Sequence, residues 1–117
     1  MSAEISSLAE IDGFIGACLV DSDTGLMLAQ EGGGKMDMEA AGAANNSVVK
    51  AKLAAIETLD LKDQIEDILI TLGKQFHLIR PLASTQAVFL YLALDKKRAN
   101  LGMARLSLKK VEATLDI

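Results

Sequence analysis

The longest uninterrupted apolar run of the chain, Ala87 to Leu94, is the feature that most constrains its fold. A strand with one wet face alternates apolar and polar residues, whereas this run presents apolar side chains on both faces. It is also far shorter than the roughly 18 apolar residues that span a bilayer. We therefore expect a strand in the middle of a sheet that is covered on both sides. A second such run, Phe14 to Val20, predicts another central strand.

A hairpin is expected after the strand Phe14 to Val20. The segment from Asp21 to Gly25 is dense in turn-forming residues, and Leu26 to Ala29 then resumes an apolar run that stops at Gly32-Gly33-Gly34. The glycines are interpreted as a flexible connection to the next element.

Three strand candidates lie in the second half of the chain, at Ile65 to Leu72, Gln75 to Leu82 and Gln86 to Leu94, and the last contains the long apolar run described above. Short turn segments separate them, which predicts an antiparallel meander. Glu66 and Asp67 suggest that the first of the three lies at a sheet edge. Pro81 lacks a backbone N–H and is therefore restricted to the end of its strand.

A short amphipathic helix is predicted from Ser2 to Ile11, because apolar residues recur there at every third position. Asn100 is a plausible N-cap for a terminal helix with one apolar stripe. On that helix Arg105, Lys109 and Lys110 are expected to face water.

A long helix is predicted from Asp37, its N-cap, to Leu59. Its first half contains the small-residue run Ala40 to Ala44, which would allow another backbone to approach closely. Gly42 within this run should cost about 1 kcal/mol relative to Ala, so a packing reason for it is expected.

The expected order is helix, two strands, helix, three strands, helix. This order predicts an α/β protein of the α+β type with an antiparallel sheet. A length of 117 residues is near the usual size of one domain, so we expect residues 1–117 to form a single domain.

Composition excludes several classes of partner. The formal net charge of −4 and the lack of a basic patch argue against nucleic acid. The N-terminus lacks the basic and apolar regions of a signal peptide, and no segment is long enough to insert in a membrane. The single cysteine, Cys18, lies in an apolar run and is interpreted as a core residue. We expect a cytoplasmic protein.

No catalytic residue, cofactor site or metal site is predicted. His77 is the only histidine and has no cysteine or second histidine at ligand spacing. Glu66 and Asp67 are adjacent on a strand, so their side chains point to opposite faces and cannot act on one bond. Gly34-Lys35 is followed by Met36, where a phosphate-binding loop needs Ser or Thr. We therefore expect a protein that is not an enzyme.

Taken together, the order and spacing of these segments resemble the roadblock/LC7 family of dynein light chains, scaffold subunits and bacterial regulators of Ras-like GTPases. The resemblance covers nearly the whole chain. It rests on the first helix leading into Asp12 to Ala17, the acidic hairpin from Asp21 to Leu26, and the Ala-rich long helix. The most specific part is Asn100 to Arg105, which opens the terminal helix.

The resemblance implies a five-stranded sheet of roadblock/profilin-like type between the long helix and the two terminal helices. It also implies a homodimer joined through the long helix and the third strand. The family has no universal catalytic residues, so the resemblance assigns none to this chain. The candidate interface residues are Ala41, Ala44, Asn45, Val48, Ile68, Ile70 and Leu72.

The function that follows from the resemblance is a protein-interaction module that regulates or scaffolds a partner, most plausibly a Ras-like small GTPase. A small-ligand sensor of related fold is the alternative, because such folds can hold a metabolite in a cleft. Uniformly aliphatic inward positions favour the interaction module.

Overall fold

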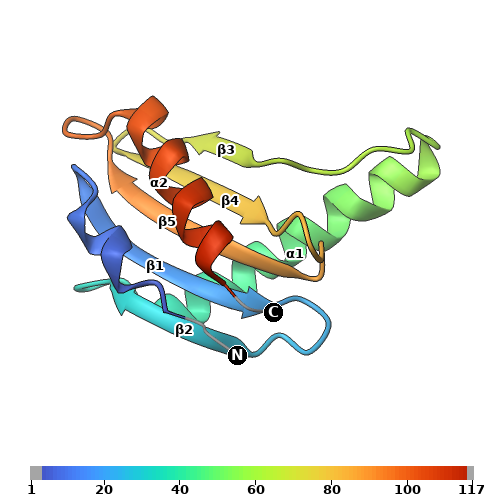
Figure 1. The fold of residues 1–117 in the computed structure, drawn as a ribbon, viewed down its shortest axis with the longest axis horizontal. Helices are drawn as coiled ribbons and strands as arrows, with labels where there is room; N and C mark the ends of the chain where they lie inside the picture. The colour runs from blue at the N-terminus through green and yellow to red at the C-terminus, as the bar shows by residue number, and fades with distance from the viewer. Residues whose placement is uncertain (1–3, 116–117) are drawn as a thin grey trace.

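The computed structural model describes residues 4–115 and contains one five-stranded antiparallel sheet with helices on both faces (Figure 1). The sheet order is β2-β1-β5-β4-β3. This architecture confirms the α+β prediction. In chain order the elements are the 3-10 helix η1 (Ser6–Glu10), β1 (Phe14–Asp21), β2 (Met27–Gly32), α1 (Met38–Thr58), β3 (Ile68–Thr71), β4 (Gln75–Pro81), β5 (Val88–Asp95) and α2 (Leu101–Thr114).

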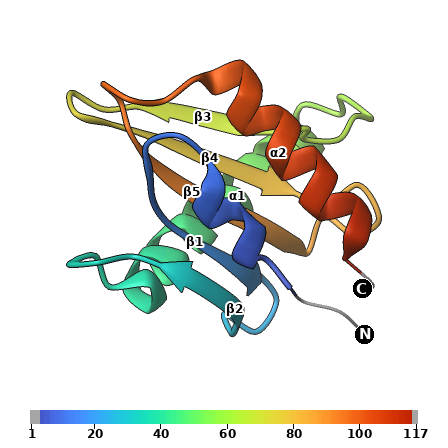
Figure 2. The same ribbon diagram turned by 60° about the vertical axis from the view of Figure 1, so that its left-hand side comes forward.

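Strand β5 lies at the centre of the sheet, as the apolar run predicted, and all of its residues but Asp95 are buried. Leu90, Leu92 and Leu94 belong to the core beneath η1 and α2. Phe89 and Tyr91 belong to a second core beneath α1. Figure 2 shows η1 and α2 on the near face and α1 behind the sheet. Strand β1 is interior but second from the edge, so its prediction as a central strand holds only in that weaker sense.

The helix caps agree with the sequence. The Asp37 side chain accepts from the backbone N–H of Glu39 and Ala40, and the Asn100 side chain accepts from Met103. These carboxylate and amide oxygens satisfy N–H groups that the first helical turn leaves without partners.

The first helix is shorter than predicted and is a 3-10 helix rather than an α-helix. Leu8 N–H donates to the carbonyl of Ile5, and Ile11 N–H donates to that of Leu8. Apolar residues at every third position match the 3.0-residue turn of a 3-10 helix, which explains the difference. Ser2, where the prediction began, lies outside the described residues.

Strand β3 is four residues long, although the sequence predicted Ile65 to Leu72. The side chain of Gln86 takes both backbone groups of Ile65: Oε1 accepts from its N–H at 3.1 Å, and Nε2 donates to its carbonyl at 3.3 Å. These groups are therefore not available for strand pairing. At the other end, Leu72 already forms the turn to β4.

The unfavourable helix propensity of Gly42 implied a packing role, and the structure shows one. The close contact is between α1 and β1 of the same subunit. A Cβ atom there would lie 3.0 Å from Val20 Cγ2 and 3.4 Å from Cys18 Sγ. Gly42 is buried, so it allows α1 to approach β1 closely. Cys18 is a core residue as predicted, and burial raises the pKa of its thiol to about 12.

Candidate functional site: helix α1 and the edge of strand β3

Strand β3 is an edge strand, as predicted, and its outer backbone groups have no neighbouring strand. Leu72 N–H donates to the carbonyl of Gln75 across the turn at 2.9 Å. Hydrogen-bonded and non-hydrogen-bonded pairs alternate along an antiparallel pair, so Ile70 and Ile68 also bond to β4. The backbone groups of Leu69 and Thr71 therefore point away from the sheet.

Helix α1 covers only part of its face of the sheet. It packs most closely on β1, less on β2 and β4, and its contact with β3 is slight. Figure 1 shows its C-terminal turns extending beyond the strands before the chain returns to β3. Ile68, Ile70 and His77 lie on the α1 side of β3 and β4, and all three are only half-buried. We call this uncovered area, formed by Ile68, Ile70 and His77, the β3 shelf.

The α1 residues predicted for the interface have different environments. Ala44 is exposed, and Val48 is 37% exposed. Ala41 is half-buried against the core beneath the helix. Leu72, just past the end of β3, is 42% exposed. The helix thus presents small and apolar side chains to solvent.

Asn45 has its side chain inside the chain rather than on the exposed face. It is 9% exposed, and Nδ2 donates to the Ala41 carbonyl at 2.7 Å. Burial raises the pKa of the nearby Tyr91 to about 12. This hydrogen bond lies within α1, and Asn45 is buried inside the subunit.

A small polar cluster lies next to the shelf. The Tyr91 hydroxyl is 3.2 Å from His77 Nδ1, and His77 Nε2 is 2.8 Å from Gln75 Oε1. The amide oxygen can only accept, so Nε2 carries the proton and Nδ1 accepts from Tyr91. Burial lowers the pKa of His77, which keeps the ring neutral. The sequence placed His77 in a predicted strand without metal-ligand partners, but it did not indicate the tyrosine partner, which is distant in sequence.

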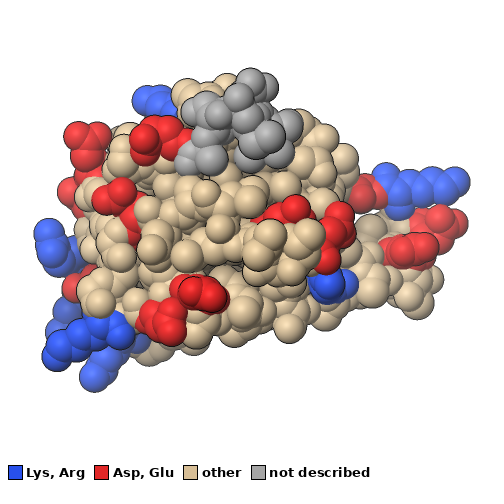
Figure 3. All heavy atoms as spheres, turned by 90° about the horizontal axis from the view of Figure 1, so that it is seen from below, with Lys and Arg blue, Asp and Glu red and all other residues tan. Residues whose placement is uncertain are grey.

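The surface hollows of the described residues do not resemble a sensor pocket. The hollow between the β3–β4 turn and the β5–α2 loop, of about 600 Å³, is lined by Gly73, Lys74, Asp95, Lys96 and Lys97. Figure 3 shows several Lys and Arg side chains at one end of this face and others towards the opposite end, with Asp and Glu side chains among them. A smaller hollow of about 300 Å³ lies between η1 and α2. The polar groups beneath α1 bind one another rather than converge on a cavity.

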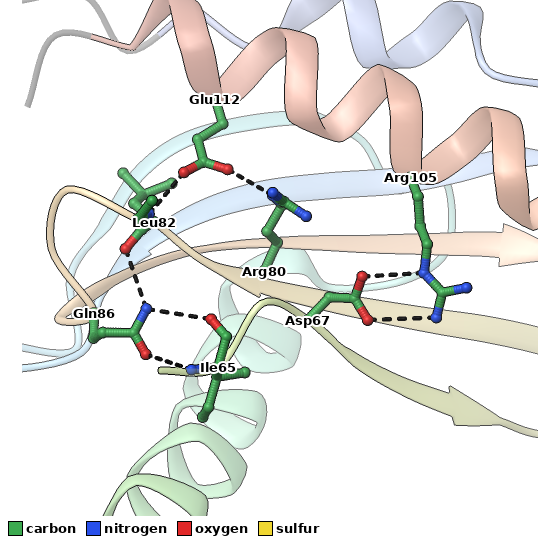
Figure 4. Close-up of polar contacts among 8 residues, drawn as sticks. Ile65, Asp67, Arg80, Leu82, Gln86, Arg105 and Glu112 are labelled. Atoms are coloured by element: carbon green, nitrogen blue, oxygen red, sulfur yellow. Dashed lines mark hydrogen bonds and ion pairs between the residues drawn. The ribbon is translucent and has the colours of Figure 1, made fainter. Parts of the chain in front are cut away.

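Two ion pairs attach α2 to the sheet (Figure 4). Glu112 Oε1 accepts from Arg80 Nε at 2.6 Å, and Oε2 accepts from the backbone N–H of Ala83 at 2.7 Å. Arg105 Nε donates to Asp67 Oδ2 at 3.0 Å. Arg105 keeps 42% of its side chain exposed, and the ion pair with Asp67, which the segment before β3 brings beneath it, was not predicted.

The glycine run after β2 is a defined turn. Gly32, Gly33 and Gly34 have φ angles of +65°, +105° and +53°, which other residues rarely adopt. The N–H of Gly33 already donates to the carbonyl of Ile15. The run therefore serves the connection to α1, through backbone conformations that favour glycine.

Among residues 4–115, no three His, Cys, Asp or Glu side chains gather at distances suited to a metal ion. Within the same range no helix has the length and apolar character needed to cross a membrane.

No protein-family model and no curated protein sequence matches the chain. Solved structures do match. The structure described as Myxococcus xanthus MglB aligns with a TM-score of 0.79 at 19% identity, over 92% of this chain and 85% of that chain. The Roadblock/LC7 domain from Streptomyces avermitilis aligns with a TM-score of 0.80 at 11% identity, over 92% of this chain and 88% of that chain.

A third structure, described as MglB with a tetrameric arrangement, aligns with a TM-score of 0.75 at 17% identity, over 91% of this chain and 77% of that chain. At such identities the likeness shows a shared architecture, because one fold can carry many functions. The chain therefore has the Roadblock/LC7 fold, as the sequence resemblance implied.

Proposed function

We propose that this protein is a homodimeric, non-enzymatic interaction module that regulates or scaffolds a partner protein, and that this partner is a Ras-like small GTPase. The observation that carries the proposal is the uncovered β3 shelf beside the small-residue face of α1. Edge strands with free backbone groups and apolar side chains promote pairing with another chain. Ile68 and Ile70 supply the apolar side chains, and Leu69 and Thr71 supply the backbone groups.

The first part of the proposal is the homodimer. Pairing β3 with a second copy would extend the sheet across two subunits. It would also cover the shelf with the α1 helix of the second copy, where Ala44 and Val48 permit close approach. A symmetric contact of this kind uses one surface twice, as most soluble oligomers do. One of the structures of the same fold is described as a tetrameric arrangement, which is in keeping with assembly of this fold.

The second part is the GTPase partner. It is supported by the sequence resemblance, whose family includes regulators of Ras-like GTPases, and by the MglB structures that share the fold. The described residues offer no nucleophile, base and orienting group in one place, so we assign the protein no chemistry of its own. Its effect on a GTPase would come from direct contact with that GTPase.

The test has two stages. Light scattering of the purified protein should give about twice the chain mass of 12.4 kDa. A Ras-like GTPase encoded in the same genome should then bind the dimer, and its rate of GTP hydrolysis or its location in a complex should change. If the protein binds none of the genome's Ras-like GTPases while a metabolite copurifies with it, the sensor interpretation replaces this one.

A further inference from the structure

We propose that the hollow between the β3–β4 turn and the β5–α2 loop binds an acidic segment of a partner protein. The four cations of these two connections are Lys74, Lys96, Lys97 and Arg98, and we call them the cationic end. The inference goes beyond the proposed function, because it requires neither the homodimer nor a GTPase as the partner.

The fold gathers positive charge that the sequence leaves apart. Lys96, Lys97 and Arg98 are consecutive, whereas Lys74 precedes β4. Figure 2 shows the two connections side by side at one end of the sheet. They hold four of the twelve Lys and Arg residues of a chain whose net charge is −4, and their only carboxylate is that of Asp95. The sequence was interpreted as lacking a basic patch, but the fold forms a small one here.

Backbone hydrogen bonds fix the frame of the hollow. The N–H of Lys96 donates to the Lys74 carbonyl at 3.0 Å, which joins the two connections. The carbonyl of Asp95 accepts from the N–H of Arg98 at 3.1 Å, and its Oδ1 accepts from the N–H of Lys97 at 3.1 Å. A frame that is already ordered lowers the entropic cost of binding a partner.

Lys96 belongs partly to this frame. Its Nζ donates to the Leu72 carbonyl at 3.4 Å and lies 5.7 Å from the centre of the Phe76 ring. The side chain therefore lies across the end of the sheet, and its charge stays beside the hollow that it lines.

The other three cations have no ionic partner in the described part of the chain. Lys74, Lys97 and Arg98 are exposed, and none of them forms an ion pair within residues 4–115. Asp12, on the turn before β1, lines a separate hollow on the α2 side. Like charges held this close repel one another and lower stability, and an anionic partner would relieve that repulsion.

The shape of the hollow favours an extended segment with several carboxylates. Its volume is about 600 Å³, and no atom lies within 4 Å of the place where a Cβ of Gly73 would stand, so the rim is open there. Lysines bind anions as separate, mobile point charges. A row of carboxylates can meet several of them at once, whereas one compact anion cannot.

The other anionic macromolecules fit less well. Nucleic acid binds through many phosphate contacts, and four cations supply few. A bilayer surface is flat, whereas these cations stand around a hollow. An acidic protein segment is therefore the occupant that the charge and the shape both favour.

The first experiment locates the binding. The isotope-labelled protein is titrated with a ten-residue peptide rich in Glu and followed by NMR at about 0.15 M salt, where exposed charges are already screened. Saturable shifts should occur at the amides of Gly73, Lys74 and residues 95–98. A peptide with Gln in place of every Glu should cause none. No shift at this salt, or shifts spread evenly over the surface, would overturn the proposal.

The second experiment changes single charges. Lys97→Glu and Lys74→Glu should each weaken peptide binding about fivefold, because each replaces an attraction by a repulsion. Lys97→Arg keeps the charge and should bind like the parent protein. Lys110→Glu makes the same change of net charge in the groove between η1 and α2 and should leave the affinity unchanged. If it weakens binding as much as Lys97→Glu, the peptide follows net charge alone and the cationic end is not its site.

Further measurements separate the alternatives. Vesicles of phosphatidylcholine and phosphatidylserine should not sediment the protein. Vesicle binding that Lys97→Glu abolishes, without binding of the peptide, would replace the protein partner by a membrane. Light scattering of Lys97→Glu should give the same mass as the parent protein, so failure of the peptide to bind leaves the homodimer standing. Thermal unfolding of each variant checks that it is folded.

Discussion

At the scale of single residues, Gly42 and His77 show how closely α1 and the sheet fit together. Gly42 has no side chain because Val20 and Cys18 occupy the space where one would lie. His77 is held between Gln75 and Tyr91 and is neutral. For Gly42 the sequence indicated a packing role but not the contacting residues, and for His77 it indicated no partner.

A larger residue at position 42 should destabilise the protein. Gly42→Leu forces its side chain against Val20 and should lower the free energy of unfolding by about 1 to 3 kcal/mol, the usual effect of overpacking. Urea denaturation at fixed protein concentration measures the change. Ala113→Leu adds the same side chain at an exposed site of α2 and should have little effect. Equal midpoints for the two variants would contradict the close contact of α1 with β1.

His77 should make stability depend on pH. Its folded pKa is lowered by burial, whereas in the unfolded chain it is near 6.5. Just below pH 6.5 the unfolded state binds more protons, so the free energy of unfolding falls as the pH falls. Urea midpoints at pH 7.5 and 5.5 should therefore differ less in His77→Gln than in the parent protein. The same pH dependence in both would show that His77 does not contribute.

At the scale of elements, the sequence predicted all five strands, both α-helices and the position of β5. Apolar runs and caps act locally, so they are visible in the sequence. The residue at which β3 begins was not predictable, because Gln86, 21 residues away, binds the backbone of Ile65. The ion pair of Arg105 with Asp67 and the cluster of His77 with Tyr91 were missed for the same reason. In the candidate site, the pattern indicated the edge strand, but the burial of Asn45 depends on how α1 sits on the sheet.

The two ion pairs that attach α2 should differ in strength. The Arg80 and Glu112 side chains are 15% and 14% exposed, whereas Arg105 is 42% exposed in its pair with Asp67. Glu112→Ala leaves Arg80 and the N–H of Ala83 without acceptors and should cost about 2 kcal/mol of stability. Arg105→Ala should cost less than about 1 kcal/mol, because water screens the pair. Denaturant midpoints of both variants test the order, and the reverse order would contradict it.

At the scale of the whole molecule, the two faces of the sheet are covered unequally. Helices η1 and α2 cover one face, while α1 leaves the β3 shelf open on the other. Apolar surface of this kind is usual where a second chain binds. We therefore regard the incomplete cover of β3 as the basis of the proposed homodimer.

A charge on the exposed face of α1 should disrupt that homodimer. Ala44→Arg places a bulky cation where two helices would approach, and it should weaken the dimer at least about tenfold while each subunit stays folded. Sedimentation velocity over a range of concentrations measures the change, and circular dichroism checks the fold. Ala113→Arg, on α2, is the matched control and should leave the sedimentation coefficient unchanged. If Ala44→Arg associates like the parent protein, α1 does not lie at the interface.

Hydrogen exchange of the outer edge of β3 tests the central claim most directly. In a single subunit the N–H groups of Leu69 and Thr71 point to solvent and should exchange within seconds to minutes. In the proposed dimer they bond to the second copy, so both should be strongly protected at concentrations where the mass is doubled, and protection should fall on dilution. Fast exchange of both amides in a protein that has the dimer mass would show that the subunits meet elsewhere.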